Sequence, residues 1–137
     1  EIPKRDWSSD VCSSDLDTLV VAQTGELFEK PIDADDARRM LRLHSGQTCT
    51  VHSALSIIDH HGVHHAALSS STVTFATITP EEEEWWIATG LWEGRSGGFQ
   101  IDGPGQLLIS HISGDWTSIV GFPVYEFGRL MRIVSRV

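Results

Sequence analysis

Two long β-type runs on either side of a short turn constrain the fold of this chain most. Residues 48–59 and 63–77 are rich in β-branched side chains and alternate between apolar and polar positions. Gly62 and its polar neighbours interrupt this pattern between the two runs. Such a pair predicts a long antiparallel hairpin. A chain of 137 residues has room for one domain around that hairpin.

A second, shorter strand pair is expected near the start of the chain. Residues 17–22 form a β-type run, and the chain returns as Leu27-Phe28-Glu29-Lys30 after the turn at Thr24 and Gly25. A hairpin with this turn pairs residues whose numbers sum to roughly 47–49. Asp17 and Lys30 are therefore expected within about one step of cross-strand pairing.

Three segments carry helix signals. The first follows an N-cap at Asp33 and ends before Gly46. The second begins with a capping box of Thr79 and Glu82 and ends at Gly90. The third is an amphipathic segment that closes the chain, with apolar residues at Val124, Phe127, Leu130, Met131 and Val134. Strand pairs interspersed with helices predict an α/β domain, in the sense of a mixed α+β fold.

Several side chains have a plain structural interpretation. Arg38, Arg39 and Arg42 could contact phosphate, but we interpret them as a solvated helix face paired with acidic neighbours. A glycine-rich stretch at residues 94–105 precedes an expected strand at 106–112. Three tryptophans are expected to pack in the core: Trp85, Trp86 and Trp92.

The first sixteen residues differ from the rest of the chain. They show neither a strand nor a helix periodicity, so no element is expected there. Residues 6–16 resemble the in-frame translation of a sequencing adapter, and the match extends upstream to Glu1. A serine-rich disordered tail is the alternative. We expect residues 1–16 to be non-native and residues 17–137 to form the domain.

The composition excludes several classes of partner. The chain carries 19 acidic and 10 basic residues, a net charge of −9, which argues against binding duplex nucleic acid. Its longest apolar runs are only a few residues long, so no membrane span is expected. Two cysteines, Cys12 and Cys49, provide no disulfide framework, and a cytoplasmic protein is expected.

Histidines cluster at the turn of the long hairpin. His60, His61, His64 and His65 flank Gly62, and His52 lies further along the same strand. Paired histidines across a hairpin can bind a transition metal. The alternative is a solvated tip without metal, because no carboxylate or cysteine beyond Asp59 completes a ligand set.

Two other groups of residues are candidates for phosphate chemistry. Asp17 could act as a general base or bind Mg²⁺, and the ammonium of Lys30 could neutralise phosphate oxygens. On spacing alone, however, the two form only a cross-strand salt bridge. In the glycine-rich stretch, Arg95 could hold a phosphate, but without a following lysine the segment is not a Walker A motif.

In order and spacing, these segments resemble the Maf family of nucleoside triphosphate pyrophosphatases, once called septum-formation inhibitors. The resemblance covers residues 17–131. It rests on Asp17-Thr18, Glu29-Lys30-Pro31, Ser45-Gly46-Gln47-Thr48 and the segments 88–92, 95–103, 112–116 and 119–123. It implies a Maf/ITPase-like fold, in which helices flank a mixed twisted sheet.

The resemblance also implies an activity. Members are hydrolases acting on acid anhydrides, which cleave a nucleoside triphosphate between its α- and β-phosphates with a divalent metal, Mg²⁺ or Mn²⁺. Asp17 matches the catalytic carboxylate or metal ligand, and Lys30 matches the phosphate-contacting lysine. Thr18 sits where base preference is set and resembles the dTTP/UTP-type branch. Family members are often dimers, although no sequence feature here indicates a homodimer.

The chain departs from the family pattern in three ways. Arg95 replaces a usual lysine, which keeps the charge but changes its geometry. Asp102 replaces a usual base-contacting glutamine, and an ionised carboxylate cannot donate, which puts a pyrimidine preference in doubt. The family's N-terminal strand and Ser/Arg-rich phosphate loop have no counterpart before Asp17. We therefore expect the 137-residue chain, made as written, to lack triphosphate hydrolysis.

A different class of function stays open at this stage. The chain could be a non-catalytic nucleotide- or metal-binding module that uses its acidic surface and the histidines of residues 60–65. The sequence upstream of Asp17 in the genome discriminates between the two, because a phosphate-loop segment there favours the enzyme.

Overall fold

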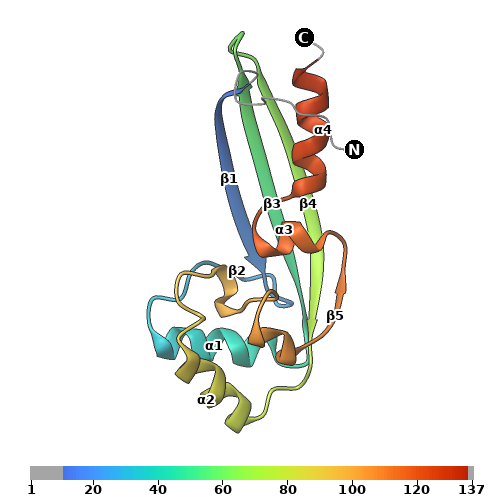
Figure 1. Cartoon of the computed structure of the whole chain (residues 1–137). Helices are drawn as coiled ribbons and strands as arrows, with labels where there is room; N and C mark the ends of the chain where they lie inside the picture. Colours follow the sequence, from blue (N-terminus) through green and yellow to red (C-terminus); the bar gives the residue numbers. More distant parts are fainter. Residues whose placement is uncertain (1–10, 136–137) are drawn as a thin grey trace.

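The chain folds into one antiparallel sheet, with helices gathered at one end and the C-terminal helix along the strands at the other (Figure 1). This computed structural model describes residues 11–135, with side chains from Ser14 onward. The strands are β1 (Val11–Val21), β2 (Leu27–Phe28), β3 (Thr48–Asp59), β4 (His64–Phe75) and β5 (Ile109–Ser113). Their order is β2-β1-β3-β4-β5.

Four α-helices and two short 3₁₀ segments accompany the sheet. The helices are α1 (Ala34–His44), α2 (Pro80–Thr89), α3 (Trp116–Val120) and α4 (Val124–Val134). The 3₁₀ segments are η2 (Ser96–Gly98) and η3 (Pro104–Leu108). The predicted α+β domain with helices flanking a sheet is confirmed. The expected mixed sheet is not, because every strand pairing in residues 11–135 is antiparallel.

The predicted long hairpin is confirmed as β3 and β4. Its register pairs Val51 with Ser71 and Ile57 with His65. Along β3, residues 49, 51, 53, 55, 57 and 59 are buried, whereas Ala54 on the opposite face is exposed. One face of the hairpin therefore packs against helices, and the other faces solvent.

The first strand begins earlier than the sequence predicts. β1 starts at Val11 and pairs with β3 as far as Asp59, although no element was expected in residues 1–16. Because a neighbouring strand offers free backbone hydrogen-bonding groups, pairing does not require an apolar period in the added segment. The prediction is thus wrong for residues 11–16, and residues 1–10 lie outside the described part.

The helix boundaries follow their predicted caps. The side chain of Asp33 accepts a hydrogen bond from the Asp36 amide at 2.8 Å. Thr79 and Glu82 form the predicted capping box, and Gly90 ends α2 in the left-handed conformation. Short polar side chains thus determine where α1 and α2 begin, and a glycine with positive φ determines where α2 ends.

The arginine face of α1 is confirmed as an ion-paired surface. Arg38 binds Asp35 at 2.7 Å and also Glu84 of α2 at 2.8 Å. Arg42 binds Glu83 of α2 at 2.9 Å. The arginines therefore join α1 to α2, a role that their sequence spacing did not show.

Two local expectations were wrong. Trp85 is 38% exposed, while Trp86 is fully buried and Trp92 nearly so. Adjacent helix positions differ by about 100° in direction, so Trp85 and Trp86 cannot both face the core. The expected strand at 106–112 begins only at Ile109, because Pro104 starts the 3₁₀ segment η3.

Hydrophobic side chains form two separate clusters. We call the larger one, with the elements α1, α2, η2 and η3 around it, the helical end. We call the smaller one, with α4 and the β3–β4 segments beneath it, the strand arm; its buried members are Leu55, Ile57, Leu130, Met131 and Val134. The candidate site lies at the helical end, where β1 meets η2. Across residues 11–135, no helix is long and apolar enough to cross a membrane.

Candidate functional site

Two adjoining cavities lie beside the end of β1. The first, of about 210 Å³, has an apolar wall and also contacts Arg95 and Asp102. The second, of about 320 Å³, is lined by Asp17 and Glu29 among others. Three residues line both cavities: Thr18, Lys30 and Ser96. The five residues proposed from the sequence are thus divided between two neighbouring spaces.

Asp17 and Thr18 lie on opposite faces of β1. In the pairing with β3, Asp17 stands opposite the exposed Ala54, and Thr18 stands opposite the buried Ser53. Neighbouring strand residues alternate in direction, which accounts for the separation. Lys30 follows β2 and lines both cavities. The Lys30 side chain therefore borders both the cavity that contains Asp17 and the cavity on the Thr18 face of β1.

The predicted register of the first hairpin is confirmed, but its ladder is short. Val20 pairs with Phe28 and Val21 with Leu27. β2 ends there, so Asp17 pairs with β3 alone. Among the described residues, Lys30 has no ion pair. Asp17 and Lys30 therefore share a cavity instead of forming the expected salt bridge.

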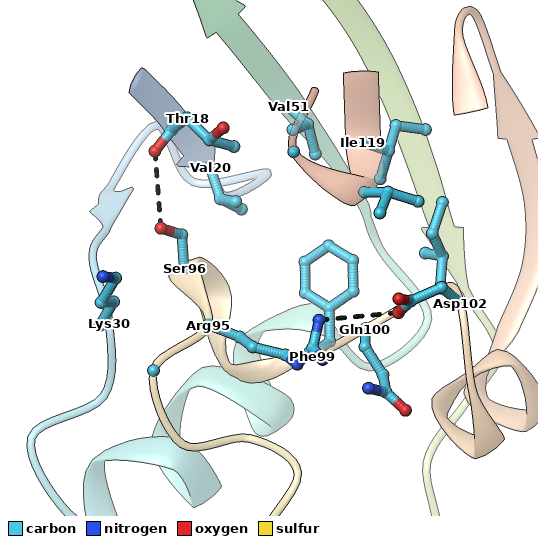
Figure 2. Close-up of a pocket in the computed structure, with 14 residues that line it drawn as sticks. Thr18, Val20, Lys30, Val51, Arg95, Ser96, Phe99, Gln100, Asp102 and Ile119 are labelled. Carbon is cyan, nitrogen blue, oxygen red and sulfur yellow. Dashed lines mark hydrogen bonds and ion pairs between the residues drawn. The ribbon is translucent and has the colours of Figure 1, made fainter. Parts of the chain in front are cut away.

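The hydroxyl groups beside the first cavity form a defined hydrogen-bond chain. Ser53 Oγ donates to the carbonyl oxygen of Ser118 at 2.7 Å. A hydroxyl has one proton, so at the 3.2 Å contact between Thr18 Oγ1 and Ser53 Oγ it is Thr18 that donates. The Ser96 hydroxyl donates to the Thr18 carbonyl at 3.5 Å (Figure 2). Thr18 and Ser96 are left with their oxygens as acceptors.

The loop that carries Ser96 is held from three sides. The Gly97 amide donates to the Glu29 carbonyl at 3.1 Å, which joins the loop to the segment before Lys30. Trp86 Nε1 donates to the Gly98 carbonyl at 2.8 Å. Gly97 has φ +80°, and a Cβ there would lie 3.0 Å from Val20 Cγ1. The close approach of the loop to β1 therefore requires glycine.

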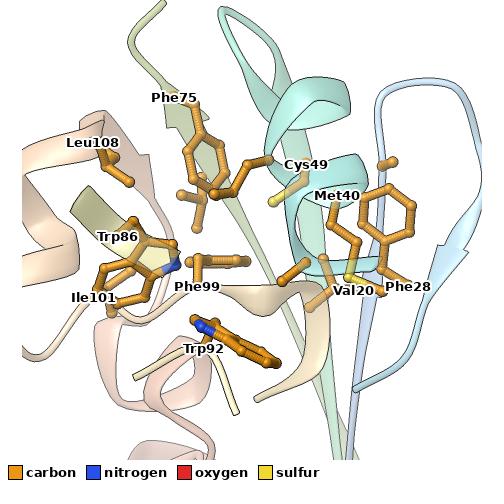
Figure 3. Close-up of a cluster of buried hydrophobic side chains, with 14 of the residues drawn as sticks. Val20, Phe28, Met40, Cys49, Phe75, Trp86, Trp92, Phe99, Ile101 and Leu108 are labelled. Carbon is orange, nitrogen blue, oxygen red and sulfur yellow. The ribbon is translucent and has the colours of Figure 1, made fainter. Parts of the chain in front are cut away.

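His44 provides the third support of the loop. Its Nε2 lies 3.1 Å from the Gly97 carbonyl oxygen, which can only accept, so Nε2 carries the proton. The ring stacks on Phe75 at 4.5 Å, in the aromatic cluster where Figure 3 shows Phe75 and Phe99. Burial lowers the pKa of His44 to about 4. The imidazole is therefore neutral near pH 7.

Arg95 and Asp102, proposed separately from the sequence, are brought together. Arg95 Nη1 and Asp102 Oδ1 are 3.6 Å apart, beside the ring of Phe99 (Figure 2). Both side chains are about one-third exposed. In this view Asp102 lies across Phe99 from Thr18 and Lys30, and Arg95 reaches toward it from the side of Ser96. The first cavity thus has a carboxylate on one side, hydroxyl groups on the other, and a guanidinium that extends between them.

The second cavity fits a divalent cation only in part. Among the described residues, no group of three His, Cys, Asp or Glu side chains gathers around one point. Mg²⁺ commonly binds one or two protein carboxylates together with water and substrate phosphates. Asp17 and Glu29 are the carboxylates that line this cavity, so the remaining ligands of such an ion would be a phosphate and water.

The histidines at the hairpin tip do not form the metal site considered from the sequence. His65 Nε2 contacts the Asp59 carboxylate at 2.9 Å, and His52 contacts Ser70 at 2.7 Å. His64 and His65 alternate between the two faces of β4. Within the described chain, His52 and His65 bind neighbouring side chains, and no three of these histidines and their acidic neighbours converge on one point.

Sequence reasoning missed two residues of this site. Ser96 lines both cavities, and its place between an arginine and two glycines was a usable signal. His44 holds the loop from below, but its position in the last turn of α1 gave no indication of that contact. Only the folding of η2 onto α1 brings them together.

Comparisons with known proteins identify the family of this chain. The family described as Maf-like protein matches residues 11–134. The dTTP/UTP pyrophosphatase of Pyrococcus furiosus is 33% identical over 122 residues, covering 85% of this chain and 64% of the relative. The dTTP/UTP pyrophosphatase of Ralstonia nicotianae is 38% identical over 107 residues, covering 78% and 52%.

The matched relatives are longer proteins. A third dTTP/UTP pyrophosphatase, of Moorella thermoacetica, is 36% identical over 121 residues, covering 85% of this chain and 60% of the relative. The chain thus spans between half and two thirds of the length of these curated relatives. The family match covers nearly all of the described residues, and the chain therefore belongs to the Maf family of nucleotide pyrophosphatases.

Proposed function

We propose that the protein acts on nucleoside triphosphates and cleaves the bond between the α- and β-phosphates, giving a monophosphate and pyrophosphate. One observation carries the proposal: Lys30 lines both the cavity of Asp17 and the cavity of Arg95 and Asp102. A ligand that occupies both cavities must pass this ammonium group. A nucleotide, with a planar base at one end and phosphates at the other, has that shape.

Each residue has a role that follows from its chemistry. The Asp17 carboxylate accepts a proton from the attacking water. At the same time the water oxygen bonds to the α-phosphorus, and the bond from that phosphorus to the leaving pyrophosphate breaks. Lys30 neutralises the negative charge that develops on the phosphate oxygens during the reaction. A bound Mg²⁺ or Mn²⁺, held by Asp17, would supply further charge neutralisation. Asp17 thus acts at the water side of the phosphate and Lys30 at its oxygens.

The charge of the two cavities supports the prediction that this 137-residue chain does not turn over. Their charged lining residues are Lys30 and Arg95 against Asp17, Glu29 and Asp102. A triphosphate brings several negative charges into a site whose described residues are already net negative. Lys30 and a metal ion are then the main sources of attraction for the phosphates, which makes binding sensitive to both.

A binding experiment tests the proposal without requiring turnover. Titration calorimetry of the chain with the α,β-methylene analogue of UTP and Mg²⁺ measures affinity, since this analogue cannot be cleaved at the α–β position. The relatives' names make UTP the first substrate to test. Lys30→Met should weaken binding about tenfold or more, because a charge-assisted contact is lost. Arg132→Met, which removes a cation from an exposed position of α4, should leave affinity unchanged.

Equal affinity in Lys30→Met and the unmodified chain would contradict the proposed phosphate contact. Pyrophosphate release with dTTP, UTP and other triphosphates plus Mg²⁺ is expected to stay at the level of a protein-free blank. Robust release would overturn the prediction of inactivity. Asp17→Asn would then have to abolish that release for the proposed role of Asp17 to hold.

The boundary at Asp17 is part of the same proposal. We propose that residues 1–16 are non-native and that the domain starts at residue 17, although the family match and β1 both begin at residue 11. Amplifying and sequencing the genomic DNA across this boundary tests it. Finding the codons of residues 1–16 contiguous with residue 17 would contradict the proposal.

Assembly and location are also proposals. A homodimer and a cytoplasmic location follow from the family resemblance and the cysteine content. Light scattering coupled to size-exclusion chromatography tests the first, since a dimer has twice the 15.1 kDa mass of the chain. Fractionation of the source cells tests the second.

A further inference from the structure

The Thr18 and Ser96 hydroxyls, which line the first cavity, are available to a ligand as acceptors. The hydroxyl proton of Thr18 is directed to Ser53, and that of Ser96 to the Thr18 carbonyl. Asp102 adds a carboxylate, which accepts and cannot donate when ionised. Apart from the cations Lys30 and Arg95, the side chains named here therefore favour a ligand that donates hydrogen bonds.

The two sides of the cavity suit different parts of a nucleotide. Figure 2 shows Lys30 on the side of Thr18 and Ser96, and Asp102 beyond the ring of Phe99. The Arg95 guanidinium lies beside Asp102, whereas Lys30 has no ion pair among the described residues, so its free ammonium group places the phosphates on the Lys30 side. The buried Phe99, with Val51 and Ile119, lines an apolar wall suited to a planar base. Asp102 is then positioned at the edge of that base.

The Asp102 carboxylate has acceptor capacity to spare. Its only charged neighbour among the described residues is Arg95, at 3.6 Å, which is longer than a hydrogen bond. No described residue donates a hydrogen bond to it. The side chain is 34% exposed, so a ligand can reach it. Both carboxylate oxygens are therefore available to two parallel donors.

Among the common bases, guanine alone offers two adjacent donors on one edge. Its N1–H and 2-amino groups lie side by side, and its O6 acceptor follows next to N1. Adenine and cytosine place an acceptor beside their amino group, and thymine and uracil flank one N–H with two carbonyls. A carboxylate with an arginine beside it is complementary to the guanine edge, where two hydrogen-bond donors are followed by one acceptor.

We propose that Asp102 binds the N1–H and 2-amino groups of guanine, with Arg95 donating to O6, and that the site prefers guanine nucleotides to uracil or thymine nucleotides. This inference rests on the proposed function and specifies its substrate. It differs from the substrates named for the relatives, which are dTTP and UTP. Asp102 is thus assigned as the residue that determines base preference.

Titration calorimetry with three α,β-methylene triphosphates tests the assignment. The analogues carry guanine, hypoxanthine and uracil, and each is titrated into the 137-residue chain with Mg²⁺. Hypoxanthine keeps N1–H but lacks the 2-amino group, so this pair isolates one contact. The guanine analogue is expected to bind about fivefold tighter than the hypoxanthine analogue and roughly tenfold or more tighter than the uracil analogue.

The variant Asp102→Asn should reverse this order. The asparagine amide has one acceptor and one donor in place of two acceptors. Its donor would face one of the two guanine donors, whereas the amide as a whole is complementary to the N–H and carbonyl groups of uracil. The guanine-to-hypoxanthine ratio is expected to fall to about one, and uracil affinity should rise. Asp35→Asn, the same change at an exposed residue of α1, should keep the wild-type ratios.

The outcomes separate this inference from the function on which it rests. Equal affinity for the three analogues, or tighter binding of uracil by the unmodified chain, overturns the guanine assignment and leaves the proposed function standing. Absence of binding by all three overturns both. The guanine-to-hypoxanthine ratio in the unmodified chain decides the question even if Asp102→Asn fails to fold.

Discussion

The helical end and the strand arm share one sheet but differ in how they are covered. At the helical end, Trp86, Leu41 and Phe28 are almost completely buried among side chains from strands and helices along most of the chain. In the strand arm, α4 covers one face of β3 and β4, and Leu68 on the other face is 61% exposed. The candidate site lies against the better-packed region.

The difference has a consequence for the site. The loop of Ser96 and Gly97 is held by Trp86, His44 and Glu29, all of them at the helical end. Positioning a ligand-binding loop requires supports that do not move, and dense packing provides them. The strand arm provides none of these three contacts.

Removing a large side chain from each region should produce the largest contrast. Trp86→Ala is expected to lower the free energy of unfolding by about 3–5 kcal/mol, because it opens a cavity and leaves the Gly98 carbonyl without its donor. Leu130→Ala in the arm should cost only about 2 kcal/mol, since α4 can settle onto the sheet. Urea unfolding followed by circular dichroism measures both. Equal losses would contradict the contrast.

Acidification should weaken the helical end first. The pKa of His44 is lowered by burial to about 4 from an ordinary 6.5, so the unfolded chain takes up the proton at higher pH. Stability is then complete above pH 6.5 and is lost as the pH falls from 6.5 to 4, by about 3 kcal/mol. Unfolding measured across this range should show the loss.

The variant His44→Phe isolates this effect. It keeps an aromatic ring against Phe75 but cannot be protonated, so its stability should change far less between pH 7 and 4. His111→Phe, at an exposed position of β5, should retain the pH dependence. A wild-type pH profile in His44→Phe would show that another group is responsible.

The strand arm should respond at lower pH and more weakly. A hydrogen bond with His65, followed by those from the Val63 and His61 amides, lowers the pKa of Asp59 to about 2 from 3.8. The stabilisation from Asp59 is present above pH 3.8 and is lost as the pH falls from 3.8 to 2. Hydrogen exchange of the Val63 amide should accelerate there relative to amides of α1. If Asp59→Asn shows the same pH profile, Asp59 is not the cause.

Much of the fold could be predicted from local sequence. The hairpin of β3 and β4 was predictable because alternation with β-branched residues is a local property, and the caps at Asp33 and Thr79 because they act on amides three residues away. The start of β1 at Val11 was not predictable, because it depends on the edge that β3 offers. The exposure of Trp85 was predictable from helix geometry alone, because neighbouring helix positions such as Trp85 and Trp86 point in different directions.

For the site, too, some features follow from the sequence and others from the tertiary structure. The sequence by itself determined which chemical groups are present: a carboxylate at Asp17, an ammonium at Lys30 and a second carboxylate at Asp102. The tertiary structure decided how they are grouped. Strand alternation put Asp17 and Thr18 on opposite faces, and β2 ended before Asp17 could pair with Lys30. Packing of the Gly97 loop on β1 placed Ser96 between the two cavities, because contacts between distant segments form only when the chain is folded.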